Sequence, residues 1–121
     1  KKFNKRIVGN SLSANHIKEE LKDSDILINA TSVGMHPNIE QSPVRPELLK
    51  PDLCIMDIVY NPLETKLAKD AKAVGAKVIS GVEMLIYQGA ASFEIWTNTH
   101  APVRTMKRAV LNKLSETGAT Y

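Results

Sequence analysis

Ser80–Trp96 reads SGVEMLIYQGAASFEIW and predicts a buried helix around which the chain is organised. Ser80 is a favourable N-cap, and Glu83 completes a capping box that satisfies two backbone donors. Apolar residues follow on nearly every side, which is typical of a helix buried all round. Gln88 is a hydrogen-bonding amide inside this run, so we expect it to be paired within the fold or to face a polar ligand. Gly89 weakens the helix relative to alanine, which predicts close packing by a neighbour.

The composition is that of one soluble globular domain: 121 residues, 43% hydrophobic and 24% charged. No apolar run approaches the roughly 18 residues of a membrane span. The mild net charge of +3 and the few aromatic residues argue against nucleic-acid binding. The single Cys54 excludes an internal disulfide and, with three scattered histidines, argues against a metal site. We therefore expect a cytoplasmic setting and, since the first residue is lysine, a fragment or a processed form.

The pattern alternates strands and helices. The expected strands are 25–30, 53–59 and 77–79, with a weak candidate at 6–9. The expected helices are 15–22, 61–74, 80–96 and one that begins at Pro102. A single helical turn is expected at 46–49 and a loose tail at 115–121. The first two main strands are short apolar runs, as in strands buried on both faces. The order predicts an α/β, doubly wound sheet of mostly parallel strands with helices on both faces.

The helix after the second strand has clear sequence signals at both ends. Asn61 is expected to cap it, Pro62 fits its first position, and Glu64 completes a capping box. Gly75 fits the left-handed stop. Its core-facing residues are expected to be Leu63, Leu67, Ala71 and Val74, and those of the last helix Val103, Met106, Val110 and Leu114.

Ligands of doubly wound sheets bind outside the carboxyl ends of the strands. This geometry alone selects three segments as the site: 31–34, 60–62 and 80–84. It does not define a reaction.

Three motifs in order resemble the NADP-binding, C-terminal domain of shikimate dehydrogenase. They are NATSVGM at 29–35, DIVYNPLET at 57–65, and the helix from Gly81 through MLIYQGA to FEIW at 93–96. The resemblance covers about residues 24–107. It implies that the whole chain, 1–121, is one partial Rossmann-like domain of an oxidoreductase that reduces 3-dehydroshikimate to shikimate with NADPH, on the way to chorismate and the aromatic amino acids.

The family's residue roles can be transferred onto the matching positions. The resemblance implies that Tyr60 and Gln88 contact shikimate. It also implies cofactor contacts by Thr31, Ser32, Ile58, Gly81 and Met84, with the last three at the nicotinamide end. Such an arrangement suits hydride transfer, because the nicotinamide and the substrate carbon must be held together.

Two parts of the family's pattern are missing. The sequence contains neither the Gly-rich phosphate loop nor the N-terminal domain with the catalytic lysine and aspartate, so no catalytic residue is assigned. Without the family's first two strands, the strand 25–30 should leave an exposed apolar edge. We expect a piece of a larger enzyme that alone neither turns over nor binds NADP tightly. The missing domain is its expected partner, and a homodimer stays open. The choice between NADP and NAD as cofactor, and between shikimate and quinate as substrate, also stays open. Thr97-Asn98 departs from the family's usual glycine after threonine.

Plainer interpretations stand beside these. Gln88 could be a core amide, Tyr60 a strand-end aromatic, Met84 ordinary core, and Gly81 a turn glycine. Asp57 is interpreted as a structural acceptor for neighbouring backbone donors. Two rival functions are a non-catalytic Rossmann-type interaction module and a receiver-like domain phosphorylated on Asp57. The receiver fold needs an acidic pair after its first strand, and none follows 6–9.

Overall fold

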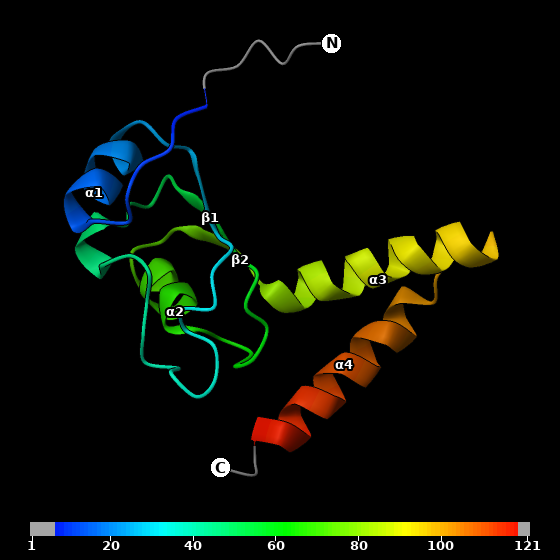
Figure 1. Ribbon diagram of the computed structural model, residues 1–121. Helices are drawn as coiled ribbons and strands as arrows, with labels where there is room; N and C mark the ends of the chain where they lie inside the picture. The colour runs from blue at the N-terminus through cyan, green and yellow to red at the C-terminus, as the bar shows by residue number, and fades with distance from the viewer. Residues whose placement is uncertain (1–6, 119–121) are drawn as a thin grey trace.

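The computed structural model describes residues 7–118, and the side chains as far as Ser115. Its elements in order are α1 (Ala14–Lys22), β1 (Ile26–Asn29), the 3-10 turn η1 (Pro46–Leu48), β2 (Cys54–Asp57), α2 (Lys66–Ala73), β3 (Lys77–Ile79), α3 (Gly81–Thr97) and α4 (Val103–Gly118). The strands pair in parallel in the order β1-β2-β3. This confirms the predicted α/β class. Figure 1 shows α1 and α2 on one side of the strands and α3 and α4 on the other.

The core lies between one face of the sheet and the helices α1 and α2. Ile55 and Leu67 are at most 1% exposed, and burial of such a side chain contributes about 1.5–3 kcal/mol. The whole cluster is Leu21, Val44, Leu49, Leu53, Ile55, Leu67, Ala71 and Ala76. Alternate residues of the strands point into it, which fixes the sheet's register against the helices.

The opposite face of β1 is open. Ile26 is 63% and Ile28 is 57% exposed, whereas Asn29 is buried on the core face. The prediction that strand 25–30 is buried on both faces is therefore wrong. The prediction of an exposed apolar edge is confirmed, because β1 pairs only with β2 among the strands that the structure describes.

The start of α2 differs from the prediction. The helix begins at Lys66 with Thr65 as N-cap, and the stretch 61–64 is a bend. Asn61 does not cap it; its carbonyl accepts a hydrogen bond from the His36 amide at 3.2 Å. Glu64 pairs with Lys72 at 2.7 Å and Leu63 is 43% exposed. Gly75 has φ +85° and ends the helix as predicted.

The helix α3 is only partly buried, which corrects the prediction of burial all round. Its buried residues are Gly81, Val82, Ile86 and Ala90, while Ile95 and Trp96 are 80% and 83% exposed. Figure 1 shows the reason: α3 runs away from the sheet, and the helix it packs against is α4. The predicted close packing at Gly89 is also wrong, since nothing lies within 4 Å of a Cβ built there.

The ends of the chain differ modestly from expectation. The part of the weak strand candidate within the described residues, 7–9, is not a strand, and Ile7 is 90% exposed. Asn98 caps α3 with φ 52°, a left-handed conformation that asparagine tolerates. The four predicted face residues of α4 are partly buried, and the helix continues to Gly118, beyond the expected start of a loose tail. Arg6 and 119–121 lie outside the described residues.

Candidate functional site

Three loops meet at the carboxyl edge of the sheet. Because β1 and β2 are parallel and Asn29 is in register with Asp57, the segments that follow these residues leave the sheet side by side. The amide of Ile58 donates to the Asn29 carbonyl at 3.1 Å and extends the pairing by one residue. The third loop leads from β3 into α3. These are the segments that strand order selected from the sequence.

Asp57 ties this edge together. Its carboxylate is 2% exposed, and Oδ1 accepts hydrogen bonds from the Val59 amide at 3.1 Å and from Asn29 Nδ2 at 3.0 Å. Its other oxygen, Oδ2, accepts from the Thr65 hydroxyl at 2.6 Å. The interpretation of Asp57 as an acceptor for neighbouring backbone donors is confirmed for the Val59 amide, and the other two donors, Asn29 and Thr65, are side chains. Since both oxygens are buried and bonded, the carboxylate is not presented for phosphorylation, which argues against the receiver hypothesis.

Asn29 and Thr65 are residues that sequence reasoning missed. Both are buried, at 3% and 2% exposure. Asn29 Oδ1 accepts from the amide and the hydroxyl of Thr31, at 3.1 and 2.7 Å, and the Thr31 hydroxyl accepts from the Val33 amide at 3.1 Å. Asn29 could have been found as the polar residue that ends an otherwise apolar strand. Thr65 was not recognised as the helix cap because the residues 61–64 before it also fit a capping pattern.

Gly81 is packed against the backbone that follows β2. A Cβ at this position would lie 2.4 Å from the Val59 carbonyl oxygen and 2.7 Å from that of Ile58. Glycine is therefore needed at this position because the helix packs directly on the backbone of the same chain. This role differs from both expected ones, a glycine required by a turn and a glycine that contacts a ligand. The contact brings the start of α3 against the Ile58 segment. The Ser80 hydroxyl accepts the Glu83 amide at 3.4 Å, so the predicted N-cap is confirmed.

The predicted residues fall into two groups. Thr31, Ile58 and Gly81 belong to one connected set of hydrogen bonds and backbone contacts. Tyr60 is 43% exposed, and the Gln88 side chain is exposed and donates to the Leu85 carbonyl of its own helix at 3.1 Å. In the described part of the chain, neither side chain hydrogen-bonds another predicted residue. Gln88 is seven positions after Gly81, which is roughly 10 Å along a helix.

The two remaining predicted residues line the same edge. Met84 is half-buried, one turn into α3, and so offers an apolar thioether surface. Ser32 is exposed, and its carbonyl accepts from the Met35 amide at 3.1 Å. Both leave side-chain surface for a ligand.

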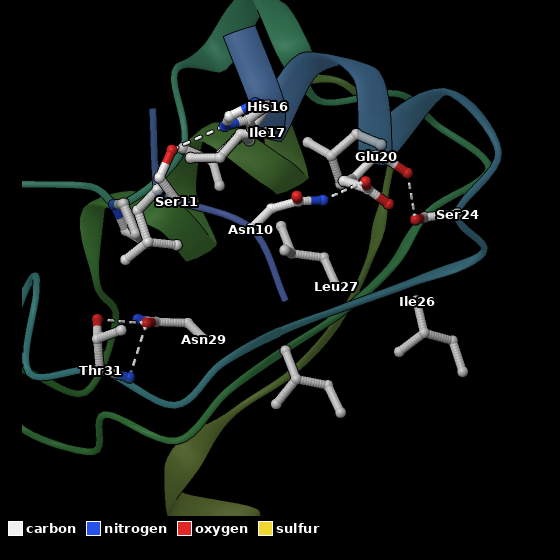
Figure 2. Close-up of a pocket in the computed structure, with 15 residues that line it drawn as sticks. Asn10, Ser11, His16, Ile17, Glu20, Ser24, Ile26, Leu27, Asn29 and Thr31 are labelled. Atoms are coloured by element: carbon white, nitrogen blue, oxygen red, sulfur yellow. Dashed lines mark hydrogen bonds between the residues drawn. The ribbon is translucent and has the colours of Figure 1, made fainter. Parts of the chain in front are cut away.

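A cavity of about 270 Å³ lies beside this edge, between α1 and β1. Figure 2 shows that Thr31 and Asn29 are at one end of it, with Leu27 and Ile26 along the strand and Glu20 on the helix. Of the seven predicted site residues, only Thr31 lines it. The cavity is largely apolar, so it adjoins the predicted site and does not coincide with it.

The ionisable groups with displaced pKa values lie outside this edge. The pKa values of Glu19, Glu64 and Glu94 are lowered, the first two by hydrogen bonds from lysines and the third by the Ala101 amide and His100. Among the described side chains, 7–115, no three of His, Cys, Asp or Glu are grouped to hold a metal ion. No helix within residues 7–118 is long and apolar enough to span a bilayer. The edge itself offers the hydroxyls of Thr31 and Ser32, the half-buried side chains of Ile58 and Met84, and backbone groups, which suit binding of an organic ligand.

Comparison with known proteins gives consistent matches. Residues 81–111 match the model of the Shikimate 5'-dehydrogenase C-terminal domain. The shikimate dehydrogenase (NADP(+)) of Methanosarcina barkeri is 52% identical over 108 residues, which are 89% of this chain and 38% of that protein. The chain therefore spans less than half the length of this relative.

Solved structures agree. A shikimate dehydrogenase in complex with NADP+ is 48% identical with a TM-score of 0.76, over 81% of this chain and 34% of that chain. A quinate dehydrogenase from Corynebacterium glutamicum in complex with NAD is 31% identical with a TM-score of 0.75, over 82% of this chain and 35% of that chain. In sequence and in fold, this chain is similar to a part of shikimate dehydrogenases, and its residues 81–111 match the model of their C-terminal domain.

Proposed function

We propose that the chain is the nicotinamide-side part of an NADP-dependent shikimate dehydrogenase. The observation that carries the proposal is the junction of Gly81 with the Ile58 and Val59 backbone, which sets the start of α3 beside the ends of β1 and β2. Relatives that match the chain over 89% and 81% of its length are a shikimate dehydrogenase (NADP(+)) and a shikimate dehydrogenase in complex with NADP+. The alternative of a non-catalytic Rossmann-type module predicts binding of neither ligand.

The residues present fit the nicotinamide end of the cofactor. A flat carboxamide ring needs an apolar wall and hydrogen-bonding groups, and the half-buried Ile58 and Met84 with the hydroxyls of Thr31 and Ser32 offer both. The bound cofactor would supply the hydride. The role proposed for this chain is to hold the ring by these residues and to hold shikimate by Tyr60 and Gln88.

The rest of the enzyme is proposed to lie in a partner region. The sequence offers no Gly-rich loop for the cofactor's diphosphate and no catalytic lysine and aspartate pair from the family's other domain. We propose that this domain completes the site, that the cytoplasm is the compartment, and that a homodimer is compatible with the open edge of β1. By the same reasoning the chain alone does not turn over.

The test is an NMR titration of the 121-residue chain with NADP+ and with shikimate, each followed through its backbone amides. We expect NADP+ to shift the amides of Thr31, Ile58 and Gly81, and shikimate to shift those near Tyr60 and Gln88. NAD and quinate are the matched second arms, because the Corynebacterium relative is a quinate dehydrogenase in complex with NAD. Absence of any shift with all four ligands, or sustained turnover by the chain alone, would overturn the proposal.

A further inference from the structure

One buried carboxylate connects all three loops of the edge. Asp57 accepts hydrogen bonds from Val59 and Asn29 on Oδ1 and from Thr65 on Oδ2, at 3.1, 3.0 and 2.6 Å. Asn29 in turn holds Thr31 through two hydrogen bonds. On the other side, the Val59 carbonyl is the atom nearest to a Cβ built at Gly81. A displacement at Asp57 is therefore passed to each loop by direct contacts.

We propose that Asn29, Asp57 and Thr65 form a positioning cluster that sets Thr31 and the Ile58–Tyr60 segment for nicotinamide binding. This inference rests on the function proposed above and adds residues that none of the motif roles assigns. None of the three side chains is exposed enough to bind a ligand itself, since their exposures are 3%, 2% and 2%. They act through the residues they hold.

Every partner of the Asp57 carboxylate donates. The Val59 amide can only donate, and the Thr65 hydroxyl donates to Asp57 Oδ2 at 2.6 Å while its oxygen accepts the Ala68 amide at 3.1 Å. The orientation of the Asn29 amide is fixed, since its Oδ1 accepts the Thr31 amide. An asparagine at position 57 would place its NH2 against the Val59 and Asn29 donors in one orientation. In the other orientation the Thr65 hydroxyl would have to turn its proton away from residue 57 and accept from the NH2. A carboxylate therefore accepts all three donors at once, whereas an amide of the same shape cannot.

The cluster also links the site to the beginning of α2. Thr65 is the N-cap of this helix, so its hydroxyl has two functions: it accepts from Ala68 and donates to Asp57. A valine at position 65 keeps the shape of threonine and loses both bonds, whereas a serine keeps the hydroxyl. This pair separates the hydrogen bond from packing.

The experiment compares Thr65→Val and Thr65→Ser in the 121-residue chain by amide hydrogen exchange. Thr65→Val is expected to accelerate exchange at Val59, Thr31 and Val33, on the far side of Asp57, and Thr65→Ser to restore slow exchange. Thr105→Val, at an exposed position of α4, is the control. Changes confined to the first turn of α2 would overturn the inference.

A second variant approaches the link from its other end, in case Thr65→Val does not fold. Thr31→Val, at a half-buried position, is expected to alter exchange at the Thr65 and Ala68 amides. Unchanged exchange at both amides would likewise overturn the inference.

Measurements of NADP+ binding by the same variants distinguish a failure of this inference from a failure of the proposed function. Thr65→Val is expected to weaken NADP+ binding about tenfold, because Thr31 and the Ile58–Tyr60 segment are no longer held in place, and Thr65→Ser is expected to recover it. Wild-type affinity in Thr65→Val would overturn the positioning role. If the unsubstituted chain binds no ligand while exchange at Thr31 still responds to Thr65→Val, the proposed function fails and the cluster is supported.

Discussion

Gly81 and Val59 lie so close that no side chain fits between them. The Cβ of an alanine at position 81 would be 2.4 Å from the Val59 carbonyl oxygen and 2.6 Å from its carbonyl carbon. Both atoms are backbone and belong to the segment that Asp57 holds through the Val59 amide. The start of α3 is therefore fixed against the end of β2, and this contact places the two halves of the predicted cofactor site together.

Gly81→Ala is expected to destabilise the chain by about 1–3 kcal/mol, because the helix must move away from a backbone that cannot yield. The matched control is Gly89→Ala in the same helix, where a Cβ has open space. There the lower helix cost of alanine should stabilise by about 0.5–1 kcal/mol. Urea unfolding followed by circular dichroism measures both, and equal effects of the two substitutions would contradict the packing described.

Leu67→Ala should lower the free energy of unfolding by about 2–5 kcal/mol, since Leu67 is 1% exposed in the core and leaves a cavity. Leu63→Ala, at a residue that is 43% exposed and outside α2, should change it by less than about 0.5 kcal/mol. Denaturant unfolding measures both variants, and a shift of the midpoint with an unchanged m value reports the change in the free energy of unfolding. A large loss at Leu63 would indicate that the helix begins earlier than the structure shows.

Ile28→Lys is expected to reduce self-association of the chain. Ile28 is 57% exposed on β1, an edge strand of the described sheet, and a charged residue on such an edge opposes pairing with another chain. Ile95→Lys, at an 80% exposed position of α3, is the control for general surface charge. Sedimentation velocity over a range of concentrations measures association. An equal reduction by both variants would show that added surface charge in general, and not the edge of β1, reduces self-association.

Acid should loosen the junction of α3 and α4 through Glu94. Its carboxylate accepts the Ala101 amide at 3.0 Å, which with His100 lowers the pKa of Glu94 below its ordinary value of 4.5. A carboxyl group whose pKa is lowered by folding stabilises the fold above the unfolded pKa, and this contribution disappears as the pH falls through the folded value. Exchange at the Ala101 amide should therefore accelerate below about pH 4.5, beyond the intrinsic pH dependence. Glu94→Gln should abolish this step, and a step that persists would exclude Glu94 as its cause.

Gln88→Ala should raise the Michaelis constant for shikimate in a hybrid enzyme. In the hybrid, this chain replaces the matched part of the Methanosarcina relative. Loss of one hydrogen bond of about 1–2 kcal/mol corresponds to roughly a 5- to 30-fold increase. Ser92→Ala, one turn further along α3, is the control. Steady-state kinetics with an unchanged constant would remove Gln88 from the site.

Much of the architecture was predictable because it depends on local patterns. The strand at 77–79 was predictable because it lies between the glycine that ends one helix and the serine that caps the next. Its observed bounds are Lys77–Ile79. The cap at Ser80 and the stop at Gly75 likewise depend on neighbouring residues. Parallel pairing follows because the connections contain helices or long loops. These features place the three loops at one edge.

The sequence by itself determined the order of elements, the parallel sheet and the loops that form its carboxyl edge, because periodicity and caps act over a few residues. Only the tertiary structure decided which donors the Asp57 carboxylate accepts, since Asn29 and Thr65 are 28 and 8 residues away along the chain. It also decided that Thr65 caps α2, because its hydroxyl is bonded on both sides, and that Gly81 is required by the Val59 backbone. The exposure of α3 was decided in the same way, because the apolar surface of a helix is buried only where another element lies against it.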